Sequence, residues 1–170
     1  MGQGVIVKTV APFEVGLVVA DIDRLLPFYR DVLGLDVIGD IEMPAERSRA
    51  SGLAPDGYRV VRLESSSGDR LKLARPAGGG VAAAATDYAM QRVGASYVTF
   101  IVDDLAALHA RLRQAGANIR SKGIVELRAG LRLLLVADPE GNFIELLQYD
   151  DIAAYRPAKG FPSQVPRRVP

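Results

Sequence analysis

The 170-residue sequence has no cysteine, and it has only one histidine, His109. The absence of cysteine excludes disulfide bonds, thiolate nucleophiles and cysteine-ligated metal sites. One imidazole is too few for iron centres built on two histidines and a carboxylate, and it is a poor start for a zinc site. We expect His109 to be a surface or boundary residue of a helix that covers the outside of a sheet.

The chain also lacks a strong excess of charge of one sign and long hydrophobic runs. Lysine and arginine together number 21 and aspartate and glutamate 20, which gives a net charge of +1. Dedicated nucleic-acid-binding proteins usually carry a marked basic excess. No apolar run approaches the roughly 20 residues that cross a bilayer, and there is no secretory-signal pattern. We therefore expect no nucleic-acid partner, no membrane segment and a cytoplasmic location.

Two halves of the chain repeat the same order of predicted elements. In each half an alternating strand is followed by an aspartate-capped amphipathic helix that ends at a glycine, and then by further strands. Glu14 and Asp21 in the first half correspond to Tyr97 and Asp104 in the second. The strands are expected at 13–20, 35–41, 58–64 and 70–74, and again at 96–102, 117–127, 131–136 and 143–149. This pattern predicts an α+β fold built from two βαβββ modules.

The predicted domain organisation is a first module over 10–76, a linker over 77–94, a second module over 95–149 and a tail over 150–170. The stretch 42–57 is expected to be a long loop. The linker contains three consecutive glycines and a run of alanines, which favour a connection with at most a short helix over 82–91. The tail is rich in proline and basic residues. Its Tyr155 and Phe161 are suited to cover the mouth of a cavity.

Two motifs carry a resemblance to a known family. Residues 28–35 read FYRDVLGL and residues 138–146 read DPEGNFIEL, in the same order as the repeat. Over residues 10–149 the sequence resembles the vicinal oxygen chelate superfamily, also called the glyoxalase/bleomycin resistance/dioxygenase fold. The resemblance implies that the two modules pair and that their mixed sheets curl around one open cavity. It also implies a small-molecule substrate or ligand and a homodimer.

Metal-dependent members of that family place four metal ligands on the first and last strands of the two modules. The corresponding positions here are Glu14, Lys72, Tyr97 and Glu145. Only Glu145 matches the usual ligand types. Since side chains alternate across a strand, and apolar residues alternate with these positions along each strand, all four are expected to share one surface.

The residue types at these positions argue against a resident metal. An extradiol dioxygenase is not expected, because its iron needs histidine ligands. Glu14, Glu145 and Tyr97 together offer an oxygen-only site that would suit Mg or Mn, and this stays open as the less favoured alternative. Lys72 disfavours it, because an ammonium group repels a divalent cation. We therefore expect no cofactor.

Without a metal, Lys72 provides a fixed positive charge in the metal's place. One glutamate is expected to pair with Lys72 and stay ionised, while the other gives and takes a proton. Tyr97 and Lys72 would stabilise a developing oxyanion. These roles predict a metal-independent or atypical-metal lyase or isomerase, which would transfer a proton, epimerise or cyclise a small oxygenated organic molecule.

Substrate binding is assigned to Thr99, on the face of Tyr97, and to Arg132, which suits a carboxylate or phosphate group. Arg59 and Arg62 alternate poorly with one face, and at least one of them is expected to be solvated. The alternative to an enzyme is a non-catalytic small-molecule binding or antibiotic-resistance protein of the same fold. A third interpretation, a purely structural Glu–Lys–Glu ionic network, also stays open.

Overall fold

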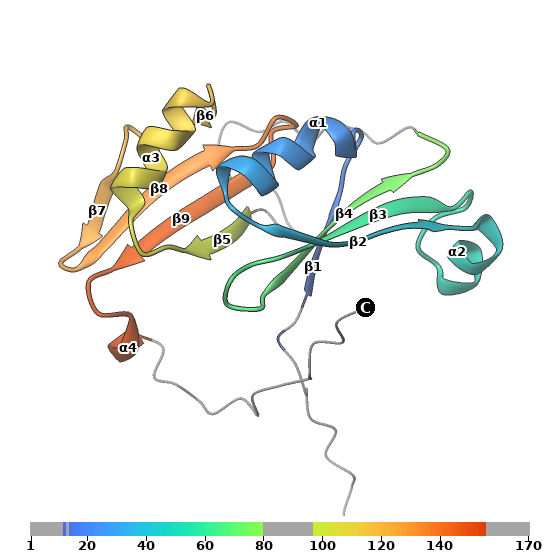
Figure 1. The fold of residues 1–170 in the computed structure, drawn as a ribbon, viewed down its shortest axis with the longest axis horizontal. Helices are drawn as coiled ribbons and strands as arrows, with labels where there is room; N and C mark the ends of the chain where they lie inside the picture. Colours follow the sequence, from blue (N-terminus) through green and yellow to red (C-terminus); the bar gives the residue numbers. More distant parts are fainter. Residues whose placement is uncertain (1–11, 13, 80–96, 156–170) are drawn as a thin grey trace, which may run out of the picture.

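The computed structural model describes residue 12 and residues 14–79 and 97–155 (Figure 1). The first half contains β1 (Glu14–Val18), α1 (Ile22–Pro27), the π-helical turn η1 (Phe28–Val32), β2 (Asp36–Met43), α2 (Ala45–Ser51), β3 (Tyr58–Glu64) and β4 (Arg70–Pro76). The second half contains β5 (Tyr97–Ile101), α3 (Leu105–Gln114), β6 (Asn118–Ile119), β7 (Val125–Arg128), β8 (Leu131–Ala137), β9 (Phe143–Tyr149) and α4 (Ile152–Tyr155).

Each half forms its own mixed sheet. The strand order is β1-β4-β3-β2 in the first sheet and β5-β9-β8-β6 in the second, where β7 also pairs with β8. The first strand of each half runs parallel to the last, and the remaining pairs are antiparallel. In Figure 1, α3 lies against β8 and β9, whereas α1 lies over the first sheet. The α+β fold with two mixed sheets is confirmed.

Alternation along the strands decides which face of each sheet is buried. Leu71 and Leu73 of β4 are buried in the core, and Lys72 between them lies on the opposite face. The same alternation buries Leu134 and Val136 of β8. These residues belong to one apolar cluster that includes α1, α3 and strands of both sheets. The two modules therefore share a single core on the helix side of their sheets.

Pro27 determines how the first helix ends. It is the sixth residue of α1, beyond the first turn where proline is harmless. Proline has no N–H and its ring crowds the carbonyl four residues earlier, and the chain continues as the wider turn η1. There the Leu33 N–H donates to the Phe28 carbonyl at 3.0 Å. Gly34 then adopts a φ of 78°, the left-handed backbone expected of the glycine that ends the helix.

A buried carboxylate joins the two modules. Asp138, only 3% exposed, accepts a hydrogen bond from the Tyr29 hydroxyl at 2.8 Å. It also accepts from the backbone N–H groups of Glu140 and Asn142 and from the Asn142 side chain. Burial, with Asp138 alongside, raises the pKa of Tyr29 well above its ordinary value, so that the phenol keeps its proton. The tight turn after β8 is thus bonded to η1.

The same turn also caps the start of α1. The Glu140 carboxylate accepts from the backbone N–H groups of Ala20 and Asp21, at 2.9 and 2.6 Å. The Asp21 side chain in turn accepts from the Arg24 N–H, as expected of an N-cap, and Asp104 does the same for α3. A negative charge at this end of a helix is favourable.

Two predictions about the elements are wrong. The expected loop over 42–57 contains α2, whose buried Ser48 donates from Oγ to the Ala54 carbonyl at 2.7 Å. The expected strand over 117–127 is broken into β6 and β7. Between them the Ser121 hydroxyl replaces main-chain pairing, because it accepts from the Leu135 N–H and donates to the Gly123 carbonyl. Most of the expected linker, including its helix over 82–91, and the tail after Tyr155 lie outside the described residues.

His109 is half-buried on α3, in keeping with a boundary residue. None of the described helices has the length and apolar character needed to span a membrane.

The Tyr29–Asp138 bond generates the first prediction. Replacing Tyr29 with Phe keeps the ring but leaves a buried carboxylate oxygen short of one donor, and this should lower the free energy of unfolding by about 1–3 kcal/mol. Urea unfolding followed by circular dichroism measures the change. Tyr58→Phe, on the other face of the first sheet, is the matched control and should change little. Equal stability of Y29F and the native chain would contradict the role assigned to this bond.

Candidate functional site

Glu14 and Lys72 lie on neighbouring parallel strands and form an ion pair. Lys72 Nζ is 2.6 Å from Glu14 Oε2. The second Glu14 oxygen is 3.1 Å from Nη1 of Arg70, whose Nε lies 2.7 Å from Glu64 Oε2. The structure therefore places four charged side chains in a row, Lys72–Glu14–Arg70–Glu64. Sequence reasoning missed Arg70, although its position two residues before Lys72 puts both on one strand face.

These contacts determine the charge state of Glu14. The hydrogen bond from Lys72, followed by that from Arg70, lowers the pKa of Glu14 below its ordinary value of 4.5. At neutral pH Glu14 is thus an ionised carboxylate with both oxygens occupied. Glu14 is therefore the glutamate that pairs with Lys72, and Glu145 is left as the candidate for proton transfer.

The other predicted residues gather on the second sheet. Thr99 and Glu145 are register partners on the parallel strands β5 and β9. Thr99 Oγ1 donates to Glu145 Oε2 at 2.7 Å. Tyr97 lies two residues before Thr99, on the same face of β5, and is 41% exposed. Within the described residues, no hydrogen bond or ion pair links this group to the Glu14–Lys72 pair.

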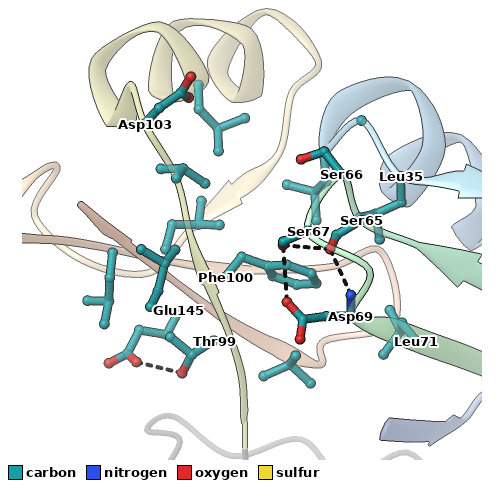
Figure 2. Close-up of a pocket in the computed structure, with 18 of the residues that line it drawn as sticks. Leu35, Ser65, Ser66, Ser67, Asp69, Leu71, Thr99, Phe100, Asp103 and Glu145 are labelled. Carbon is teal, nitrogen blue, oxygen red and sulfur yellow. Dashed lines mark hydrogen bonds between the residues drawn. The ribbon is translucent and has the colours of Figure 1, made fainter. Parts of the chain in front are cut away.

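A cleft of about 710 Å³ lies between the two modules. One wall is formed by β5 and the adjacent part of β9, where Thr99 and Glu145 line it, and the other includes the turn 65–67 (Figure 2). Figure 2 shows the Phe100 ring between the Thr99–Glu145 pair and that serine turn. Arg70 also lines the cleft, but Glu14, Lys72 and Tyr97 are not among its lining residues.

The start of the tail reaches this cleft. Tyr155, in α4, is one of its lining residues and stacks on Tyr149 with the ring centroids 4.1 Å apart. This places Tyr155 where the sequence predicts a covering aromatic residue. Phe161, the second aromatic of that prediction, lies outside the described residues.

Arg132 is not brought to the cleft. It forms an ion pair with Asp150 and alternates in phase with Leu134 and Val136, which are buried on the helix side of the sheet. The predicted role of Arg132 in substrate binding thus gains no support from its position. Arg62, in contrast, is the register partner of Lys72 on β3 and lies on the same face.

The residues at the four ligand positions do not fit a divalent cation. The Lys72 ammonium occupies one position, and both oxygens of Glu14 are committed to cationic partners. Across residues 14–79 and 97–155, no group of three histidine, cysteine, aspartate or glutamate side chains is arranged to hold a metal ion. At these positions the described residues present the Lys72–Glu14 ion pair and one further carboxylate, that of Glu145.

The sequence matches the family model described as the Glyoxalase/Bleomycin resistance protein/Dioxygenase superfamily over residues 10–146. Among curated proteins none matches this chain. A glyoxalase family protein from Bacillus cereus has a similar structure, with a TM-score of 0.73 and 22% identity over 87% of this chain and 99% of its own.

Two further solved structures are similar. A glyoxylase/bleomycin resistance protein/dioxygenase domain from Frankia sp. EAN1pec gives a TM-score of 0.62 at 20% identity, over 81% of this chain and 90% of its own. The trypanothione-dependent glyoxalase I of Leishmania major gives 0.53 at 24% identity, over 84% of this chain and 87% of its own. At these identities the likeness shows the fold.

The lowered pKa of Glu14 generates a prediction about stability and pH. Because this pKa is lower in the folded chain than its ordinary value of 4.5, the ion pairs stabilise the fold above that value. The stabilisation is lost as the pH falls through the folded-state pKa. Glu14→Gln should lower the free energy of unfolding by up to about 1 kcal/mol at neutral pH and by less in acid.

Urea unfolding of both proteins from pH 7 downwards measures this difference. Glu126→Gln, at an exposed position of β7, is the control. A stability gap for E14Q that is the same in acid as at neutral pH would show that the ion pairs do not cause it.

Proposed function

The chain belongs to the glyoxalase/bleomycin resistance protein/dioxygenase superfamily, and we propose that it is a metal-independent lyase or isomerase for a small oxygenated organic molecule. The observation that supports this most directly is the 2.6 Å ion pair between Lys72 and Glu14. It puts a fixed cation on the last strand of the first module, at a position where the resemblance implies a metal ligand.

Glu145 is the proposed proton carrier. Its carboxylate lines the cleft and accepts one hydrogen bond, from Thr99, which orients it and leaves its other oxygen without a hydrogen bond in the described part of the chain. In the proposed reaction that oxygen takes a proton from a carbon next to a carbonyl group. The proton then returns to another position of the same molecule, or a leaving group departs.

The negative charge formed on the substrate oxygen needs stabilisation. Lys72 is the cationic candidate for this role, because its side chain remains 39% exposed after pairing with Glu14. Tyr97 is the neutral candidate, since its exposed side chain carries a hydroxyl on the same face as Thr99. Hydrogen-bond donors held in place before reaction stabilise such an oxyanion without reorganisation.

A non-catalytic binding protein is the second candidate. It is favoured by the apolar part of the cleft wall, which includes Val15, Leu71 and Phe100. It is also favoured by the hydrogen bonds that both glutamates already make. A homodimer and a cytoplasmic location, both expected from the sequence, remain part of the proposal in either case.

Carbon–hydrogen exchange tests the catalytic proposal without knowledge of the full reaction. The native chain is incubated in D₂O with a panel of small hydroxy and oxo compounds, and loss of carbon-bound proton signals is followed by NMR. We expect exchange for at least one compound. Glu145→Gln should slow it about 100-fold or more, because the proton carrier is removed, and Lys72→Met should also slow it.

Glu126→Gln is the matched control and should keep the native rate. If ligand-observed NMR shows binding but no compound exchanges, the chain is the binding protein of the second candidate. If E145Q exchanges as fast as the native chain, Glu145 is not the proton carrier.

Metal independence has a separate test. Elemental analysis of tag-free protein, purified without chelators and then soaked with Mg, Mn, Fe, Ni or Zn salts, should find no stoichiometric metal. Exchange activity should survive EDTA. A stoichiometric metal that disappears in the Glu145→Gln variant would mean that Lys72 does not stand in for a metal, and the protein would be a metal-dependent member of the family.

A further inference from the structure

Arg62 lies beside Lys72 on the face of the first sheet that faces away from the core. It is the register partner of Lys72 across β3 and β4, and of Gly39 across β2 and β3. The Cβ atoms of directly opposite residues in an antiparallel pair are about 4.5–5.5 Å apart. Two cationic side chains therefore leave the sheet next to one another.

Among the described residues, no acidic partner neutralises Arg62. In the described part of the chain it makes no hydrogen bond or ion pair, and its Nε is buried without an acceptor. Two other arginines of this sheet differ: Arg59 bonds to Asp23 and Asp40, and Arg70 bonds to Glu14 and Glu64. A partly buried guanidinium without an acceptor is unfavourable, and an external anion would relieve that cost.

Two glycines shape the surface around this pair. A Cβ at Gly39 would lie 3.0 Å from Nη2 and 3.1 Å from Nε of Arg62, so the guanidinium rests where a side chain on β2 would otherwise be. On the other side of Lys72, its register partner on β1 is Gly16, and a Cβ there would meet nothing within 4 Å. The two cations thus lie between two positions that carry no side chain.

Arg62 is the cation of this face that has no ion pair among the described residues. Glu14 pairs with Lys72 and Arg70, Glu64 pairs with Arg70, and Asp36, the register partner of Glu64, is a third carboxylate on the same face. A monoanion would supply the acceptor that Arg62 lacks, whereas a dianion such as phosphate would be repelled more strongly by these carboxylates. A planar carboxylate also matches the flat guanidinium of an arginine.

We propose that Arg62, next to Lys72, binds a carboxylate group of the small molecule on which this chain acts. The inference rests on the proposed function in placing the substrate at Lys72, and it narrows the substrate class to small monocarboxylic acids. It gives Arg62 the task that the sequence assigned to Arg132.

Binding measurements on the full chain test this without turnover. Lactate and pyruvate are each compared with their methyl esters by calorimetry and ligand-observed NMR. We expect the native chain to bind at least one acid about tenfold or more tightly than its ester. Arg62→Gln should remove that preference. Arg75→Gln, which removes the same charge from the opposite face of β4, should keep it.

Gly39→Ala is the second variant, in case Arg62→Gln disturbs folding. Its added methyl group displaces the guanidinium without changing any charge, and its backbone is not in the left-handed region that alanine avoids. It should weaken the preference for the acid while the ester binds as before. Inorganic phosphate is the competing anion and should displace the acid poorly.

The proposal is overturned if neither acid binds, if acid and ester bind the native chain equally, or if R62Q and R75Q behave alike. It is also overturned if phosphate displaces the acid readily. A preference for acids without any exchange in D₂O would sustain the role of Arg62 and remove the catalytic proposal. Exchange in D₂O that is confined to uncharged compounds would sustain the catalytic proposal and remove the role of Arg62.

Discussion

The buried carboxylate of Asp138 is the interaction on which the arrangement of the two modules depends. In the described residues the two sheets share no strand pairing, so their relative position is set by the common core and by polar contacts across it. Asp138 accepts a hydrogen bond from Tyr29, which lies 109 residues earlier in the chain, and Glu140 of the same turn caps α1. A buried carboxylate tolerates little movement of its donors, because each lost bond exposes an unpaired charge to an apolar core. The cleft lies between the two modules whose relative position these contacts fix.

Charge on the outward face of the first sheet is organised by strand register. Parallel pairing of β1 with β4 brings Glu14 to Arg70 and Lys72, and antiparallel pairing of β3 with β4 brings Arg62 alongside Lys72. Each carboxylate is thus held by strands rather than by flexible loops. A cation fixed in this way supplies positive charge without the coordination geometry that a metal ion demands, and the proposed acid–base chemistry depends on this property.

Local sequence rules predicted much of this molecule. Alternation found the strands and the face of Lys72, and Asp21 and Asp104 are the caps that their positions suggested. The same alternation would have placed Arg132 in phase with Leu134, on the core side, had it been applied to that residue. Local alternation does not determine which residues of distant strands become register partners. The neighbours of Arg62 therefore needed the structure, in particular the irregularity between Val37 and Gly39 that brings Gly39 beneath the guanidinium.

One wall of the cleft is a strand at the edge of its sheet. Among the described residues β5 pairs only with β9, and its residues 98–101 line the cleft. The other edge of β5 has main-chain N–H and C=O groups, which no substitution of side chains can remove. Over evolutionary time such a wall can change its shape and apolar character while keeping a constant polar frame. Relatives with other residues at positions 98–101 would therefore be expected to accept differently shaped ligands in a common orientation.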